Sequence, residues 1–235
     1  MKINIPNEAL NVINVLKKSG YQAYIVGGYI RDTLLHKVSY DIDINTNATP
    51  KQVKEILKEY RVNDTFEKYG CIKFKINEYQ IEITTFRKEY EYINHRKPSK
   101  IEFIEDLHED LKRRDFTINA LCFDGEKFVD LFNGLEDLNK KNIKMIGDPI
   151  KRFEEDAVRI LRALRFCCKL GFDLDEEIQI AIKEKSHLLN SLNNSVKARE
   201  IEGIIKGSYY REMSTKYKEL FGLCRIRRDI DGIFI

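Results

Sequence analysis

The patterning of this 235-residue chain changes once, near Gly147-Asp148-Pro149. Upstream of this point, short apolar segments with the two-residue period of strands alternate with helical segments. From Ile150 onward, apolar residues recur at helical spacing almost throughout. Because strand signals stop where helices take over, the sequence predicts an α+β domain over residues 1–147, with a mixed sheet and helices, followed by an all-helical domain over residues 148–235.

A polar, charged and aromatic segment from Arg87 to Lys100 has no clean period, so it is expected to be a mobile loop. In the second domain, one continuous helix is expected from Ile150 to Leu170. The other main expectations are strands at 23–26, 41–44, 71–76 and 80–86, and helices at 7–18, 50–57, 115–121, 175–185, 196–205 and 209–220.

Composition places the chain among ordinary globular proteins. Its formal net charge is +3, which by itself does not indicate a nucleic-acid partner, but basic residues outnumber acidic ones between Val196 and Arg228. The five cysteines are odd in number and show no paired metal spacing, as is typical of reduced thiols. The N-terminus lacks a signal-peptide pattern and no apolar stretch is long enough to span a bilayer. We therefore expect a cytoplasmic protein with no membrane contact; its oligomeric state stays open.

Asp41 and Asp43 stand two residues apart on a predicted strand, so both carboxylates project from one face while Ile42 and Ile44 enter the core. Oxygen ligands on a rigid strand suit two Mg²⁺ ions that align an attacking hydroxyl with a nucleotide α-phosphate. Glu82, between two isoleucines of another strand, is a candidate third carboxylate or base. Taken alone, Asp-x-Asp more often marks a solvated strand face.

Gly27 and Gly28 follow a predicted strand and precede a helix, just upstream of the two aspartates. Glycines there let backbone N–H groups approach a triphosphate. Arg31 is placed to reach the same phosphates, although it is equally suited to pair with Asp32 on the helix surface.

Two further clusters carry arginine, the residue suited to bidentate phosphate contact. Arg113 and Arg114 precede Asp115-Phe116-Thr117-Ile118-Asn119-Ala120, which also reads as a charged helix start. Farther on, an acid and three arginines recur at every third residue, either as an exposed salt-bridged ridge or as a reader of base edges. In the second reading the acid accepts from the amino group of cytosine or adenine and rejects guanine and uracil. These four residues are Asp156, Arg159, Arg162 and Arg165.

Taken together and in this order, the three clusters resemble the class II CCA-adding tRNA nucleotidyltransferases and their bacterial poly(A) polymerase relatives. The resemblance extends over roughly residues 20 to 222. It rests on Val26 to Asp32 with Asp41-Ile42-Asp43, on Arg113 to Ala120, and on Glu155 to Phe166.

The resemblance implies a polymerase-β-like head over residues 1–147 with the metal site and a helical neck over residues 148–235 with an amino-acid template. Gly28, Arg31, Arg114 with its neighbour Arg113, and the four residues of the third cluster are then the nucleotide contacts. The segment ending at Arg96-Lys97-Pro98 is similar to the flexible loop of members that add the terminal A. Full-length bacterial members continue through body and tail helices, so the resemblance implies that these are truncated here.

The implied activity is magnesium-dependent transfer of CMP and AMP from CTP and ATP to the tRNA 3′ end, with release of pyrophosphate. An A-adding enzyme or a poly(A) polymerase shares the same head and template helix and stays open as the nearest alternative. A non-catalytic RNA-binding relative and a small-molecule nucleotidyltransferase are more distant ones. The basic C-terminal stretch from Lys206 to Arg228 is either a source of phosphate contacts or a solvated helical surface.

Overall fold

The computed structural model describes Ile3 and residues 5–226, and Arg227 and Arg228 of the predicted basic stretch lie outside the described residues. Two compact units divide the chain: the first holds residues up to 89 together with 101–135, and the second holds 90–100 together with residues from 136 onward. No described helix is both long and apolar enough to cross a membrane.

The first unit is built on a six-stranded mixed sheet in the order β3-β4-β2-β1-β7-β8. All its pairs are antiparallel except β2 and β4, which run parallel. The bounds are β1 (Ala23–Val26), β2 (Asp41–Thr46), β3 (Cys71–Ile76), β4 (Tyr79–Thr85), β7 (Cys122–Phe123) and β8 (Phe128–Val129).

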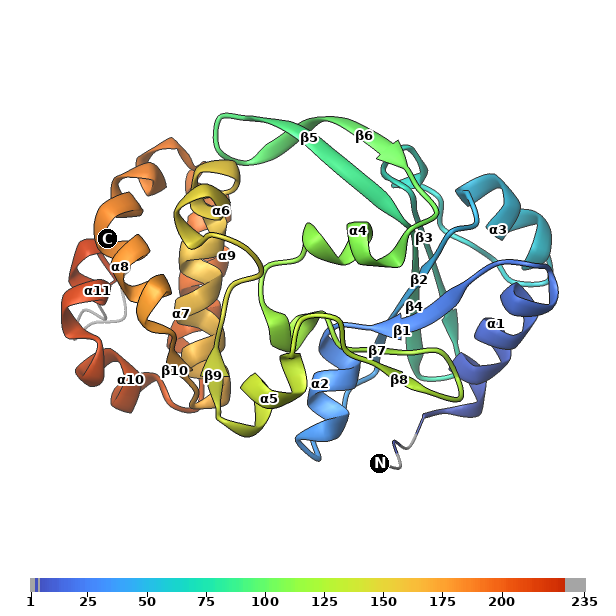
Figure 1. The fold of residues 1–235 in the computed structure, drawn as a ribbon, viewed down its shortest axis with the longest axis horizontal. Coiled ribbons are helices and arrows are strands. Elements are labelled where there is room, and N and C mark those ends of the chain that lie inside the picture. Colours follow the sequence, from blue (N-terminus) through green and yellow to red (C-terminus); the bar gives the residue numbers. More distant parts are fainter. Residues whose placement is uncertain (1–2, 4, 227–235) are drawn as a thin grey trace. The chain divides into compact units, whose positions relative to one another are not determined.

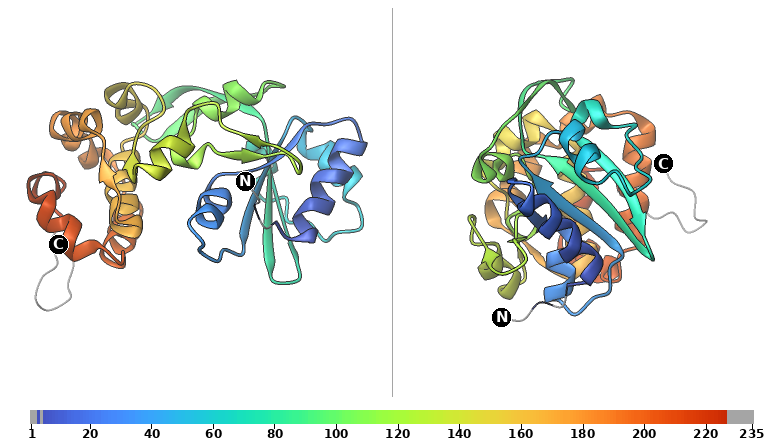
Figure 2. Two further views of the ribbon diagram at one scale, coloured as in Figure 1. Left: turned by 60° about the horizontal axis from the view of Figure 1, so that its bottom comes forward. Right: turned by 90° about the vertical axis from the view of Figure 1, so that its right-hand side faces the viewer.

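Helices cover both faces of this sheet. Helix α1 (Asn7–Lys18) and α3 (Pro50–Ile56) lie on one side, and α2 (Gly28–Leu34) and α4 (Leu107–Lys112) on the other (Figures 1 and 2). The side chains of Ile42 and Ile44 are fully buried, as the alternation of β2 predicts. The aspartates of the same strand therefore project toward the opposite face.

A hairpin formed by β5 (Arg87–Ile93) and β6 (Lys97–Phe103) replaces the mobile loop that the sequence predicts. The prediction was wrong because charged and aromatic residues alternate on both faces of β5, none of which is fully buried. A strand without an apolar face has no hydrophobic period to detect, and here the backbone pairing between β5 and β6 holds it. The tip of the hairpin belongs to the second unit.

The second unit is mainly helical. Helix α7 (Val158–Leu170) packs against α9 (Asn194–Ile205) and α10 (Tyr210–Lys216), while α6 (Pro149–Glu155) packs against α8 (Glu176–Lys185). The same unit contains a short parallel pair formed by β9 (Asn142–Ile143) and β10 (Asp173–Leu174). The remaining elements are α5 (Gly134–Asn139), which begins in the first unit, the 3-10 helices η1 (Glu67–Tyr69), η2 (Thr117–Asn119) and η3 (Ser186–Ser191), and α11 (Lys218–Leu223).

Three helix predictions need correction, and in one of them the helix expected at 209–220 is divided at Tyr217 into α10 and α11. The expected helix from Ile150 to Leu170 is interrupted at Asp156, whose backbone is extended with φ −140°, and α7 starts only after it. The Asp156 carboxylate accepts a hydrogen bond from the Val158 backbone N–H at 3.1 Å, which favours a new helix start there. The expected helix at 115–121 is only the 3-10 turn η2.

Candidate active site

Asp43 and Glu82 are register partners on the parallel strands β2 and β4, and Asp41 lies two residues before Asp43. The structure therefore brings the three predicted carboxylates to one region of the sheet. Asp41 is exposed and Asp43 is partly buried. The Glu82 carboxylate already has two neighbours, since Lys73 Nζ lies 2.5 Å from it and the Cys71 thiol donates to it at 3.1 Å.

Burial raises the pKa of Asp43 to about 6. Arg114 is the largest influence in the opposite direction, while the nearby charges of Glu82 and Asp41 push the pKa up again. A carboxyl group whose ionised form is disfavoured by burial and by two like charges is stabilised when a cation binds beside it.

Within the described residues, no group of three or more His, Cys, Asp or Glu side chains is gathered closely enough to hold a metal ion. The arrangement still fits Mg²⁺, which is usually held by one or two carboxylates together with substrate phosphates and water. Asp41 and Asp43 supply two hard oxygen ligands of this kind on adjacent positions of one strand face.

The backbone between β1 and α2 passes beside this acidic region. Gly27 has a φ of +74°, which favours glycine, and a Cβ built on it would lie 2.9 Å from Arg114 Nη1 and 3.5 Å from Asp43 Oδ2. At Gly28 a Cβ would meet only Arg31 Nη2, at 3.5 Å, so the backbone there is open. The glycine pair thus lets the chain run close to both a carboxylate and a guanidinium.

The predicted arginines of the first unit are held by polar partners. Arg31 is almost fully buried, and it pairs with Asp32 at 2.7 Å and donates to Asn119 Oδ1 at 2.5 Å. The pairing with Asp32 that the sequence offered as an alternative is therefore present. Arg114 donates to Asn45 Oδ1 at 3.2 Å and to the Asn119 carbonyl at 3.3 Å.

Behind Arg113 and Arg114 lies a buried acid that the sequence analysis missed. Asp110 is fully buried; it accepts from Arg113 Nε at 2.9 Å, from the Arg87 backbone N–H at 3.0 Å, and from the side chain of Asn45. Asn45 connects this acid to Arg114. The signal for Asn45 was its place on β2, two residues beyond Asp43 and on the same face; the long-range partner Asp110 had no comparable signal.

The predicted base-reading residues all lie in the second unit. Asp156 sits at the junction of α6 and α7, and Arg159, Arg162 and Arg165 follow on α7. The exposed helix of the alternative is not found, because α7 is buried almost all round and Arg159 itself is only 5% exposed; the ion pairs of that alternative are present.

Each guanidinium of α7 has defined neighbours. Arg159 donates to Glu155 at 2.7 Å and to the Arg152 carbonyl at 2.9 Å. Arg162 lies over the ring of Phe166, at 5.4 Å from its centroid. Arg165 pairs at 3.1 Å with Glu200 of α9, a carboxylate that is 1% exposed. No local pattern in the sequence indicates Glu200, because its partner is thirty-five positions away.

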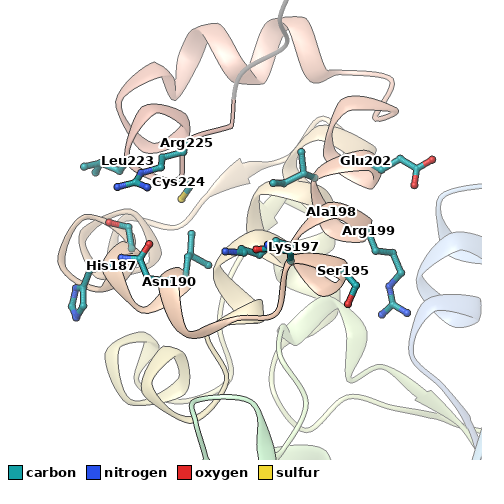
Figure 3. Close-up of a pocket in the computed structure, with 14 residues that line it drawn as sticks. His187, Asn190, Ser195, Lys197, Ala198, Arg199, Glu202, Leu223, Cys224 and Arg225 are labelled. Atoms are coloured by element: carbon teal, nitrogen blue, oxygen red, sulfur yellow. The ribbon is translucent and has the colours of Figure 1, made fainter. Parts of the chain in front are cut away.

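A separate cavity of about 920 Å³ lies in the second unit (Figure 3). Its walls come from η3, from α9 between Asn194 and Glu202, and from the end of α11 with the two residues after it. Three cations line it, Lys197, Arg199 and Arg225, together with the single acid Glu202. Among the described residues, no carboxylate pairs with Lys197 or Arg225.

Comparison with known proteins gives consistent relatives. Residues 23–144 match the model of the "Poly A polymerase head domain" family. A CCA-adding enzyme of Lactobacillus helveticus is 45% identical over 187 residues, which is 79% of this chain and 46% of that protein. This chain spans about half the length of the curated relatives it matches.

Solved structures agree in fold. The Bacillus stearothermophilus CCA-adding enzyme in complex with CTP superposes with a TM-score of 0.79 at 32% identity, covering 93% of this chain and 57% of that one. A tRNA nucleotidyltransferase complexed with a primer tRNA and an incoming ATP analogue has a TM-score of 0.70 at 31% identity, covering 90% and 62%. The predicted polymerase-β-like head and helical neck are thereby confirmed as a fold class. The chain belongs to the family of CCA-adding enzymes and poly(A) polymerases that share the poly A polymerase head domain.

Proposed function

We propose that this chain carries the catalytic head and neck of a template-independent tRNA nucleotidyltransferase. It adds CMP and AMP from CTP and ATP to the tRNA 3′ end and releases pyrophosphate. The observation that carries the proposal is the pair Asp41 and Asp43, aligned on one strand face with Glu82 as the register partner of Asp43. This acidic region lies beside Gly27 and Arg114 in a chain whose curated relatives are CCA-adding enzymes.

In this proposal the first unit binds the triphosphate and two Mg²⁺ ions. The ions, when bound to Asp41 and Asp43, supply charge neutralisation and alignment for in-line displacement at the α-phosphate. The open backbone at Gly28 and the guanidinium of Arg114 favour the negative charge of the phosphates. Glu82 pairs with Lys73 and provides a third carboxylate beside Asp43, which can act as a proton acceptor. Arg31 and Arg113 hold this lining in place through Asn119 and Asp110.

The second unit supplies base selection. A carboxylate at Asp156 accepts from the exocyclic amine of cytosine or adenine, and it repels the carbonyl that guanine or uracil places there. Arg159 supplies the matching donor, held in direction by Glu155. Arg162 and Arg165 lie on the same helix. Arg165 stabilises its packing through the ion pair with Glu200.

The partner in this proposal is the 3′ end of a tRNA. Supporting it are the relative solved with a primer tRNA and the cationic cavity around Lys197 and Arg225, which suits phosphate oxygens. The predicted stretch from Lys206 to Arg228 contributes Arg225 to that cavity. A cytoplasmic location belongs to the same proposal and is supported by five cysteines that are all free thiols.

The head-domain family that matches this chain is named after poly(A) polymerase, so an enzyme that adds only A is the second candidate. The two are separated by incubating the protein and Mg²⁺ with tRNAs that end before CCA, after C and after CC. Each labelled triphosphate is supplied singly, and CTP is then supplied with ATP. Ordered addition of C, C and A that stops there supports the proposal, whereas A alone or a long A tail supports the second candidate.

The matched variants are Asp41→Asn and Asp64→Asn. Asp64 is an exposed acid whose partner is Lys54 on the surface of α3, so its loss should leave incorporation unchanged. Incorporation by wild type that disappears only in Asp41→Asn places the chemistry at the acidic region. No incorporation by wild type on any tRNA would refute the proposed activity for this chain.

A further inference from the structure

The hairpin of β5 and β6 turns through two residues of unusual backbone conformation. Asn94 and His95 have φ values of 51° and 50°, and the Arg96 N–H donates to the Ile93 carbonyl at 3.1 Å. Two consecutive residues with positive φ between hydrogen-bonded strands are typical of a type I′ turn, whose twist matches that of the strands. A turn this short fixes the direction in which Arg96 leaves the hairpin.

This turn is bound to the junction between α6 and α7 on both sides of Asp156. The His95 carbonyl accepts from the Ala157 backbone N–H at 2.9 Å, and His95 Nδ1 contacts the Glu154 carbonyl. Between these two contacts, Arg96 Nη1 donates to Asp156 Oδ2 at 2.9 Å. The hairpin tip and the junction belong to the same unit.

The two oxygens of the Asp156 carboxylate have separate neighbours. Oδ1 accepts from the Val158 N–H and starts α7, so it serves the helix. Oδ2 accepts from Arg96. A cytosine or adenine amine that is read by Asp156 needs an acceptor oxygen, and the oxygen not used by the helix is the one that Arg96 holds. The guanidinium N–H and the exocyclic amine are both donors, so they compete for one site.

We infer that Arg96 competes with the base for Asp156: it holds Oδ2 until a base with an exocyclic amine displaces it, and it thereby weakens the binding of cytosine and adenine nucleotides. The inference rests on the proposed function. Guanine and uracil present a carbonyl at this position and have no donor with which to replace the guanidinium. A base that is read by Asp156 must therefore break an ion pair. Its apparent affinity is the intrinsic affinity multiplied by the fraction of molecules in which Arg96 does not hold Asp156.

Two further arginines of α7 act on the Asp156 carboxylate. Burial raises the pKa of Asp156, and Arg96 is the nearby charge that lowers it most, but Arg159 and Arg162 act in the same direction from α7. The Arg159 guanidinium lies 5.7 Å from the centroid of the Tyr92 ring of β5, so it stays beside the hairpin. Displacement of Arg96 thus leaves a carboxylate flanked by two arginines.

The test is the equilibrium binding of CTP, ATP, GTP and UTP, each with Mg²⁺, to wild type, Arg96→Gln and Lys100→Gln. Lys100 is a cation of the same hairpin that lies over the Tyr90 ring instead of contacting Asp156. We expect Arg96→Gln to lower the dissociation constants of CTP and ATP about fivefold, as for the loss of a partly exposed ion pair. GTP and UTP binding should not change, and Lys100→Gln should match wild type.

A double-mutant cycle with Asp156→Asn isolates the competition. The asparagine keeps the oxygen that starts α7 but loses the charge that Arg96 binds, so adding Arg96→Gln to Asp156→Asn should have no effect on CTP affinity. Unchanged or weaker CTP binding in Arg96→Gln alone would overturn the inference, because a residue that contacts the nucleotide favourably gives that result.

Hydrogen exchange without nucleotide distinguishes this inference from the proposed function. Both Arg96→Gln and Asp156→Asn should speed amide exchange at Ala157, whose N–H is bonded to His95, and Lys100→Gln should not. Unchanged exchange in both variants would overturn the contact itself. Faster exchange together with no nucleotide bound to any variant would instead refute the proposed function, and the competition would fall with it.

Discussion

The guanidinium of Arg114 passes so close to the backbone of Gly27 that a Cβ on residue 27 would lie 2.9 Å from Nη1. Gly27 also has a φ of +74°, so an alanine there is disfavoured twice, by its backbone conformation and by the contact. The glycine and the arginine together define the side of the acidic region that faces β1.

We therefore expect Gly27→Ala to displace Arg114 and to lower the nucleotidyl transfer rate at least about tenfold. The matched control is Gly20→Ala, since Gly20 has a φ of +89° but no atom within 4 Å of its Cβ position. Both variants should lose about 1 kcal/mol of folding stability to backbone strain. Equal activity of the two variants would show that the approach of Arg114 does not matter for the reaction.

The raised pKa of Asp43, about 6, predicts how stability changes with pH in metal-free protein. The folded state binds this proton more tightly than the unfolded state, whose carboxyl titrates near 3.8, so stability falls as pH rises from 3.8 through about 6. Asp43→Asn removes that cost. We expect it to raise the free energy of unfolding by about 1 to 3 kcal/mol at pH 7.5 and by little at pH 3.5. Urea unfolding with EDTA at both pH values measures the difference, and no gain at pH 7.5 would contradict the assignment.

Glu200 and Glu202 provide a matched pair on α9. Glu200 is 1% exposed and pairs with Arg165 of α7, whereas Glu202 is exposed and pairs with Lys206 one turn away. Glu200→Gln leaves Arg165 without its buried counter-charge and should cost about 2 kcal/mol, while Glu202→Gln should cost less than about 0.5 kcal/mol. Chemical unfolding of the two variants checks this. Similar losses would mean that the pair does not hold α7 to α9.

The cationic cavity predicts a salt effect on tRNA binding. If Lys197 and Arg225 contact phosphates, the double variant Lys197→Gln/Arg225→Gln should lower the slope of log K against log salt by about one for each lost contact. Lys51→Gln/Lys58→Gln removes the same charge from exposed positions on and just after α3 and should leave the slope unchanged. A slope that is equal in both double variants would exclude the cavity from the RNA contact.

The elements that the sequence predicted well are those in which one face is apolar. Strand β2 alternates aspartate with isoleucine, and the isoleucines are buried as expected. The strands expected at 71–76 and 80–86 are present as β3 and β4, and the turn between them has a φ of 53° at Asn77. In both places the local pattern and the tertiary fold favour the same structure.

The break between α6 and α7 and the contacts of Asp156 could not be predicted in the same way. The three-residue spacing of Asp156, Arg159, Arg162 and Arg165 continues across the break, because only one residue leaves the helical conformation. Aspartate is a favoured residue at helix starts, which was the available signal. Arg96 is sixty residues away in sequence, and no periodicity reveals such a partner.

The parallel ladder between β2 and β4 pairs Asp43 with Glu82, and in the same register it pairs Ile42 with Ile81 and Ile44 with Ile83. Since side chains alternate between faces, a slip of one residue would bury carboxylates and expose isoleucines. A molecule in which the two strands are misaligned therefore cannot also have a well-packed core. In a preparation of this protein, the fraction of molecules that has folded cooperatively should equal the fraction that is competent to bind metal, with no inactive but stable population between them.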